Sequence, residues 1–249
     1  MAQSTITQRT CEFLERLSCN NNKEWFLANK EEYLCLQKEL NEFSQELIDG
    51  IASFDPNLKA QKPGVKDCTY RIYRDVRFTK NKQPYKTHIG IYVNRGGKKS
   101  LYGGYYLHIE PIIDKTQAEY PTLVLEDQAM SLGGSLLACG LYCPQLKILQ
   151  SVRDEISVNG DSFLDAIKLA KGFSLDNYSV LKKMPKGFDN VNENWQFLLK
   201  HKDFSLSKPI SNEFLSSSNV LENIIKEFKK TYEFNRVVNL AVDYAIEQL

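Results

Sequence analysis

Residues 70–93 read YRIYRDVRFTKNKQPYKTHIGIYV, and two segments of this stretch alternate polar and apolar side chains. The first segment covers residues 70–78 and the second covers residues 85–93, with a polar, turn-like segment between them. A period of two residues is typical of β-strands, because successive side chains point to opposite faces of a sheet. The stretch therefore predicts an antiparallel hairpin.

Helical patterns flank this hairpin. Residues 6–17, residues 26–47 and much of the chain after residue 144 place apolar side chains three and four positions apart. Further strands are expected at residues 102–110, 122–126 and 132–141. We therefore predict one α+β domain over residues 1–249, with a central antiparallel sheet (about 69–141) packed by helices from 1–55 and 144–249. Two lobes that meet at a cleft are the alternative.

The composition is that of a soluble globular protein, with 249 residues, 42% hydrophobic and 25% charged. The net charge of +1 argues against bulk electrostatic binding to nucleic acid or to an anionic membrane. No apolar segment approaches the roughly 20 residues of a membrane span, and the N-terminus lacks the pattern of a secretory signal. We therefore expect a cytoplasmic protein without membrane contact.

The six cysteines are scattered and lack the paired spacing of a zinc site. Scattered cysteines in a cytosolic chain are most often reduced residues of the core. No nucleophile elbow, phosphate-binding glycine loop or dinucleotide fingerprint occurs either. The cysteines therefore predict no metal centre, and the sequence names no cofactor.

The most concentrated charge lies in residues 71–86, which contain three arginines, three lysines and one aspartate, a net charge of +5. If residues 70–78 form a strand, Arg74 shares a face with apolar side chains, and a buried guanidinium needs a carboxylate or a bound anion. Asp75 points to the opposite face and is expected to pair with Arg71 and Arg77. The partner of Arg74 is then either a carboxylate such as Glu24 or Glu110, or a phosphate or carboxylate ligand.

Other residues near this cluster add alternatives. Lys82 and Lys86 are either solvated or help to hold an anion, and Tyr73 and Tyr85 are either sheet residues or a stacking surface. Two predicted strands also carry His88 and His108. With Asp75 and Glu110 these histidines form a metal site, form an acid–base pair, or are ordinary satisfied histidines. Asn29 interrupts an otherwise apolar helix seam, so it bonds to another element, lines a pocket or lies at a wet edge.

The pattern Arg71-x-x-Arg74-Asp75-x-Arg77-Phe78, followed by Asn81-Lys82-x-Pro84-Tyr85-Lys86, resembles the signature of a bacterial family, domain of unknown function 2461. A second motif, Asn21-Asn22-x-x-Trp25-Phe26-x-x-Asn29-Lys30-x-x-Tyr33, resembles the N-terminal motif of that family. The likeness spans nearly the whole chain, although the segment of residues 112–130 is longer than the corresponding segment in the family. The resemblance implies kinship and no particular activity.

The function predicted from the sequence is an arginine-rich anion-binding site, acting on a phosphorylated or carboxylated small molecule if the protein is an enzyme. A nucleotide-binding or nucleic-acid-binding module, which the net charge does not favour, and a structural protein with an arginine ion-pair network are the alternatives. The sequence does not decide whether there is a reaction, and it does not give the oligomeric state. The expected catalytic residues are His88, His108 and Asp75; the expected anion-binding residues are Arg71, Arg74, Arg77, Lys82 and Lys86; and the expected pocket-lining residues are Asn29, Tyr73, Tyr85 and Tyr106.

Overall fold

The computed structural model describes residues 5–111 and 132–247. The helices before the sheet are α1 (Ile6–Cys19), α2 (Lys23–Ala28), α3 (Lys30–Ala52), α4 (Pro56–Ala60) and α5 (Val65–Cys68). The strands are β1 (Ile89–Val93), β2 (Gly104–Ile109), β3 (Leu136–Leu141), β4 (Ser174–Leu175) and β5 (Phe204–Pro209). The later helices are α6 (Leu146–Leu169), the 3-10 helix η1 (Glu193–Trp195), α7 (Gln196–Leu199), α8 (Asn212–Leu215), α9 (Val220–Lys230) and α10 (Tyr232–Glu247).

The five strands form one antiparallel sheet in the order β1-β2-β3-β5-β4, with helices packed on it, so the α+β prediction is confirmed. The sheet differs in extent from the prediction. Its regular part begins at Ile89, and it gains β4 and β5 from the region that was expected to be helical. The strand expected at residues 122–126 lies outside the described residues. No helix within the described ranges is both long and apolar enough to cross a bilayer.

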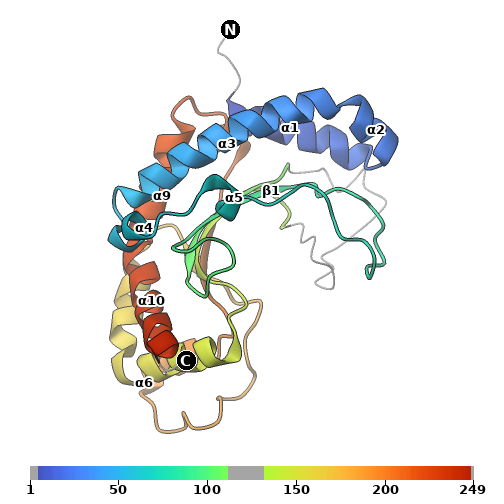
Figure 1. Ribbon diagram of the computed structural model, residues 1–249. Helices are drawn as coiled ribbons and strands as arrows, with labels where there is room; N and C mark the ends of the chain where they lie inside the picture. Colours follow the sequence, from blue (N-terminus) through green and yellow to red (C-terminus); the bar gives the residue numbers. More distant parts are fainter. Residues whose placement is uncertain (1–4, 112–131, 248–249) are drawn as a thin grey trace.

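One face of the sheet forms the core. Strand pairing places Ile91 opposite Leu107 and Leu107 opposite Leu137, and all three side chains are buried. On the same face, the ring of Tyr105 lies 5.5 Å from that of Phe228 in α9. Figure 1 shows the helices following an arc around the sheet. The opposite face of β2 carries polar and aromatic side chains, because alternate residues of a strand point to opposite sides.

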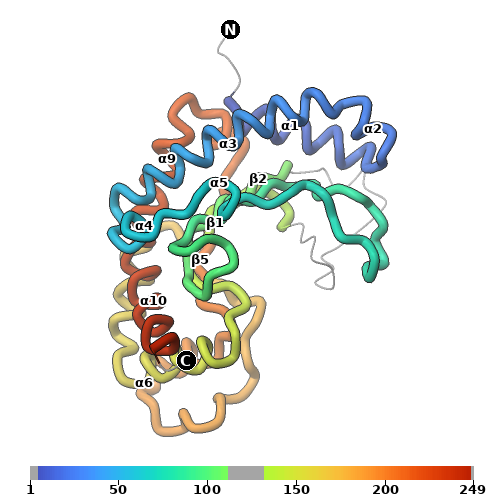
Figure 2. Tube along the Cα trace, viewed as in Figure 1, coloured from blue at the N-terminus to red at the C-terminus, as the bar shows by residue number. Residues whose placement is uncertain are grey.

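The chain between α5 and β1, which we call the basic arm (residues 69–88), projects from the sheet below α1 and α2 (Figures 1 and 2). It forms only isolated bridges, between Tyr73 and Tyr85 and between Thr69 and Ile91. The amide of Arg74 donates to the carbonyl of Pro84 over 2.9 Å. The predicted pairing of residues 70–78 with residues 85–93 is therefore reduced to a loose hairpin.

The N-terminal helices hold the arm in place. Asn21 bonds to both backbone groups of Tyr85: its Nδ2 donates to the carbonyl over 2.9 Å, and its Oδ1 accepts from the amide over 3.1 Å. The ring of Phe26 stacks on the ring of Tyr85 with centroids 4.0 Å apart. The two sequence motifs of the family resemblance are thus in direct contact, and the first motif supports the second.

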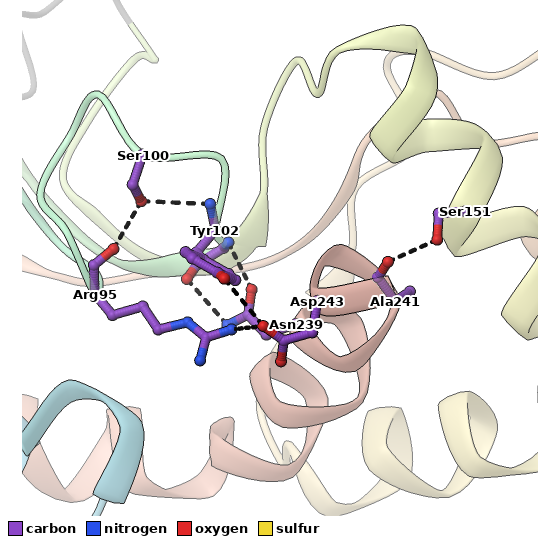
Figure 3. A network of polar contacts seen from close by, with 8 residues as sticks. Arg95, Ser100, Tyr102, Ser151, Asn239, Ala241 and Asp243 are labelled. Carbon is purple, nitrogen blue, oxygen red and sulfur yellow. Dashed lines mark hydrogen bonds and ion pairs between the residues drawn. The ribbon is translucent and has the colours of Figure 1, made fainter. Parts of the chain in front are cut away.

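A polar network joins the turn after β1 to α10 (Figure 3). Arg95 forms an ion pair with Asp243, and its guanidinium lies 3.5 Å from the ring centroid of Tyr102. The hydroxyl of Tyr102 donates to the same carboxylate over 3.0 Å. Asn239 exchanges two hydrogen bonds with the backbone of Gly103, over 2.8 Å and 3.2 Å. These contacts fix the start of β2, and therefore the strand that carries the candidate site.

Candidate functional site

The site is centred on His108, whose side chain is buried on the polar face of β2. The Nε2 atom of His108 lies 3.0 Å from the Oε2 atom of Glu110, and the Nδ1 atom lies 2.9 Å from the hydroxyl oxygen of Tyr106. Tyr106 and His108 are two positions apart on β2, and Glu110 follows two positions later, directly after the strand, so their side chains share a face. When Glu110 is ionised it can only accept, so a neutral His108 donates from Nε2 and accepts from the Tyr106 hydroxyl.

Ser135 holds the backbone of Glu110 through both of its polar groups. The amide of Glu110 donates to the Ser135 hydroxyl over 2.9 Å, and that hydroxyl donates back to the Glu110 carbonyl over 3.0 Å. The carboxylate also accepts from the amide of Leu132 over 2.8 Å. A carboxylate held by several donors has a fixed orientation, so Glu110 faces His108 in a defined geometry.

His88 completes the cluster from the end of the basic arm. Its ring lies against the ring of His108, with centroids 4.7 Å apart and planes at 30°. Burial, and next the neighbouring His108, lower the pKa of His88 to about 4 against an opposing effect of Glu110. His88 is therefore a neutral ring at pH 7 that can accept a hydrogen bond or bind a metal ion.

Positive charges of the arm gather beside His88. Lys86 and Arg74 both contribute to the lowered pKa of His88, so they lie within electrostatic reach of its ring. The pKa of Lys86 is itself lowered, first by burial and then by the charges of Arg71 and Arg74. Lys86 and Arg74 are half-buried, and the Nη1 of Arg74 donates to the Gln83 carbonyl over 2.9 Å. Lys86 and Arg74 are therefore near His88, and Arg71 is near enough to Lys86 to lower its pKa.

The other charged candidates lie elsewhere on the arm. Asp75 and Arg77 are exposed and form an ion pair with a shortest separation of 2.6 Å, as expected from the sequence. Arg77, and more weakly Arg71, hold the pKa of Asp75 down to about 2. Lys82 is exposed and donates to the Val76 carbonyl over 3.0 Å. The described contacts of Asp75 are therefore with the arginines and do not include the histidines.

The expected pocket-lining residues divide into two groups. Tyr106 lies in the site. Tyr73 and Tyr85 belong to the arm, where their rings contact each other with centroids 5.5 Å apart. Asn29 is half-buried and separates α2 from α3, which the sequence analysis treated as one helix. Its Nδ2 donates to the Trp25 carbonyl over 2.8 Å, so a local bond satisfies this amide.

Sequence reasoning missed the residues that shape the site. Gly90 faces Tyr106, and a Cβ at Gly90 would lie 2.7 Å from the tyrosine hydroxyl, too close for a real contact. The absence of a side chain there lets the Tyr106 hydroxyl reach His108. The supporting roles of Asn21 and Ser135 also depend on pairing between distant segments. Of these residues, only Gly90 gives a local signal in the sequence, because a glycine inside a strand often marks a close approach of another group.

A polar cavity lies beside the network of Figure 3, lined by residues that include Asn94, Arg95 and Asn235. Its volume is only about 10 Å³. That is roughly the space needed for the centre of one water molecule. This cavity is therefore too small for an organic ligand, and the cluster around His108 is the better candidate for function.

The fold and the site define an α+β protein in which a half-buried Tyr106, a buried His108 and a buried Glu110 are joined by hydrogen bonds beside a basic arm. The chain belongs to the family described as "Conserved hypothetical protein (DUF2461)", whose family model matches residues 9–113 and 129–236. The match omits residues 114–128, which lie inside the stretch expected to exceed the family pattern. Neither the curated proteins nor the solved structures contain a match to this chain.

Proposed function

We propose that this protein binds a small phosphorylated or carboxylated molecule on the basic arm and holds it against the His88–His108 pair. The observation that carries the proposal is the proximity of Arg74 and Lys86 to His88, with Arg71 near enough to Lys86 to lower its pKa. Cations that disfavour one another in this way are stabilised by an anion placed among them. Arginine suits such a ligand, because its guanidinium can bond to phosphate or carboxylate with two parallel donors.

The same geometry supports acid–base chemistry on a bound molecule. The hydroxyl of Tyr106, the ring of His108 and the carboxylate of Glu110 form a continuous hydrogen-bonded chain. The ring of His88, the last residue of the arm, lies against the ring of His108. A ligand held by Lys86 and Arg74 would therefore meet His88 first, and His88 would exchange a proton with the ligand.

The proposal predicts that Lys86→Met weakens anion binding while Arg77→Met does not. Both variants lose one positive charge from the same arm, but the Arg77 guanidinium is already bound to Asp75 and is exposed. A charge-assisted hydrogen bond is worth about 1.5–3 kcal/mol, so Lys86→Met should raise the dissociation constant for inorganic phosphate or citrate roughly 10- to 100-fold. Isothermal titration calorimetry measures this directly. Equal losses in the two variants would indicate diffuse attraction to the arm and not a site.

A second candidate function has one observation in its favour. Phe78 is 92% exposed at the tip of the arm, and the Arg77 guanidinium lies 5.6 Å from its ring centroid. Exposed aromatic rings interleaved with cations suit stacking on single-stranded nucleic acid. Titration with an oligonucleotide at several salt concentrations separates the two candidates. Binding that weakens steeply with salt and is lost in Phe78→Ala would favour the nucleic-acid function.

A further inference from the structure

We infer that His88, His108 and Glu110 form a binding site for a divalent transition-metal ion. One potential ligand atom from each residue lies within 4.8 Å of the other two. Two ligands of one zinc ion, each about 2.1 Å from the metal, are at most about 4.2 Å apart. Side-chain movements of less than about 1 Å would therefore bring all three atoms into a common coordination sphere.

The donor set is chemically suited to such an ion. Two imidazoles and one carboxylate are the ligands of many catalytic zinc and iron sites, which keep further positions open. His108 and Glu110 are only 1% and 3% exposed, and they approach each other by their polar atoms. A metal ion at this place would replace the proton between Nε2 and the carboxylate. The glutamate would supply one negative charge to balance the ion.

The surroundings of His108 already provide the support that a metal ligand needs. Histidine ligands usually donate their second ring N–H to an acceptor, which fixes the ring and its tautomer. The Tyr106 hydroxyl lies 2.9 Å from Nδ1 of His108 and would accept from it when Nε2 binds the metal. Glu110 is fixed in turn by the Leu132 amide. The cluster is thus restrained before any ion binds, and little ordering is needed on binding.

The open positions of the ion would face the cations of the arm. Lys86 and Arg74 are close enough to His88 to lower its pKa, and Lys86 is two residues from His88 on the arm. Such an arrangement favours an anionic oxygen as the remaining ligand, bound by the metal on one side and by the arm on the other. The metal site itself does not depend on the anion proposal, because its three ligands are all protein side chains.

The test is a titration with Zn²⁺ alone, in a buffer free of phosphate and carboxylate ligands. Cys19, Cys35 and Cys143 are exposed thiols, so the titration uses a background in which all three are replaced by serine. We expect one ion per chain, and at least a 100-fold weaker dissociation constant in both His88→Gln and Glu110→Gln. Tyr106→Phe should weaken binding roughly 10- to 100-fold, as the loss of an outer hydrogen bond does.

His201→Gln serves as the matched control, because it removes a buried histidine outside the cluster and should leave the affinity unchanged. Circular dichroism of each metal-free variant checks folding, and Glu110→Gln decides the question if His88→Gln fails to fold. A cobalt(II) spectrum without thiolate charge-transfer bands would support nitrogen and oxygen ligation. No binding, or binding that His88→Gln and Glu110→Gln leave intact, would overturn the inference. Phosphate binding measured without metal remains a separate test of the proposed function.

Discussion

Replacing Gly140 by alanine is expected to destabilise the protein by about 2–5 kcal/mol, the sum of a strained backbone and an overpacked contact. Gly140 has a φ of +107°, which side chains of L-residues rarely adopt. A Cβ atom there would lie 2.1 Å from the carbonyl oxygen of Phe204 in the paired strand β5. Backbone cannot move aside as a flexible side chain can, so the pairing of β3 with β5 would have to open.

Gly187→Ala isolates the backbone part of this effect. Gly187 has a φ of +92°, but a Cβ at that position would meet nothing within 4 Å. Its replacement should therefore cost only about 1–2 kcal/mol. Urea unfolding followed by tryptophan fluorescence measures both variants. If both substitutions lowered the free energy of unfolding equally, the close approach of β3 and β5 at Gly140 would be contradicted.

Replacing Phe26 by alanine should both destabilise the fold and weaken the candidate site. Phe26 is 1% exposed and stacks on Tyr85 of the basic arm. Removing a buried phenylalanine side chain costs about 3–5 kcal/mol. Because Phe26 also holds the arm, phosphate should bind to the folded variant at least about 10-fold more weakly, a change of 1.4 kcal/mol. Thermal unfolding and calorimetry measure the two effects.

Phe163→Ala is the control for this prediction. Phe163 is fully buried in α6 and belongs to the same core, so its loss should destabilise the protein to a similar degree. It has no contact with the arm among the described aromatic contacts, so phosphate affinity should be unchanged in conditions where both variants are folded. A parallel loss of affinity in Phe163→Ala would mean that binding follows general stability and not the position of the arm.

Much of the fold could be predicted because the helix and strand periods are clear where burial is one-sided. Strand β5 was missed although Phe204 and Leu206 are buried and alternate with Ser205 and Ser207. The pattern is short and lies between helical patterns, so its period alone did not distinguish it from a loop. The regular strand expected at residues 70–78 was wrong because Asp75 bends the backbone locally, accepting from the amide of Arg77 over 3.2 Å.

The candidate site could be predicted only in part. His88 and His108 were singled out from the sequence, and the pairing of β1 with β2 is what brings their rings together. The ion pair of Asp75 with Arg77 was expected from the sequence, whereas its lack of a described contact with the histidines was not, because the arm is too irregular to alternate strictly. Arg74 and Lys86 lie on the same face of the loose hairpin. The hydrogen bond from the amide of Arg74 to the carbonyl of Pro84 sets the register that places them there. Long-range register, and not residue type, decided which candidates meet.

The most direct test of the anion site is a ring-nitrogen NMR titration of the three histidines with inorganic phosphate. The chain contains only His88, His108 and His201, so each ring can be assigned by single substitution. We predict that phosphate moves the signals of His88 and His108, leaves those of His201 in place, and has no such effect in Lys86→Met. Phosphate binding that leaves His88 and His108 unmoved would contradict the account.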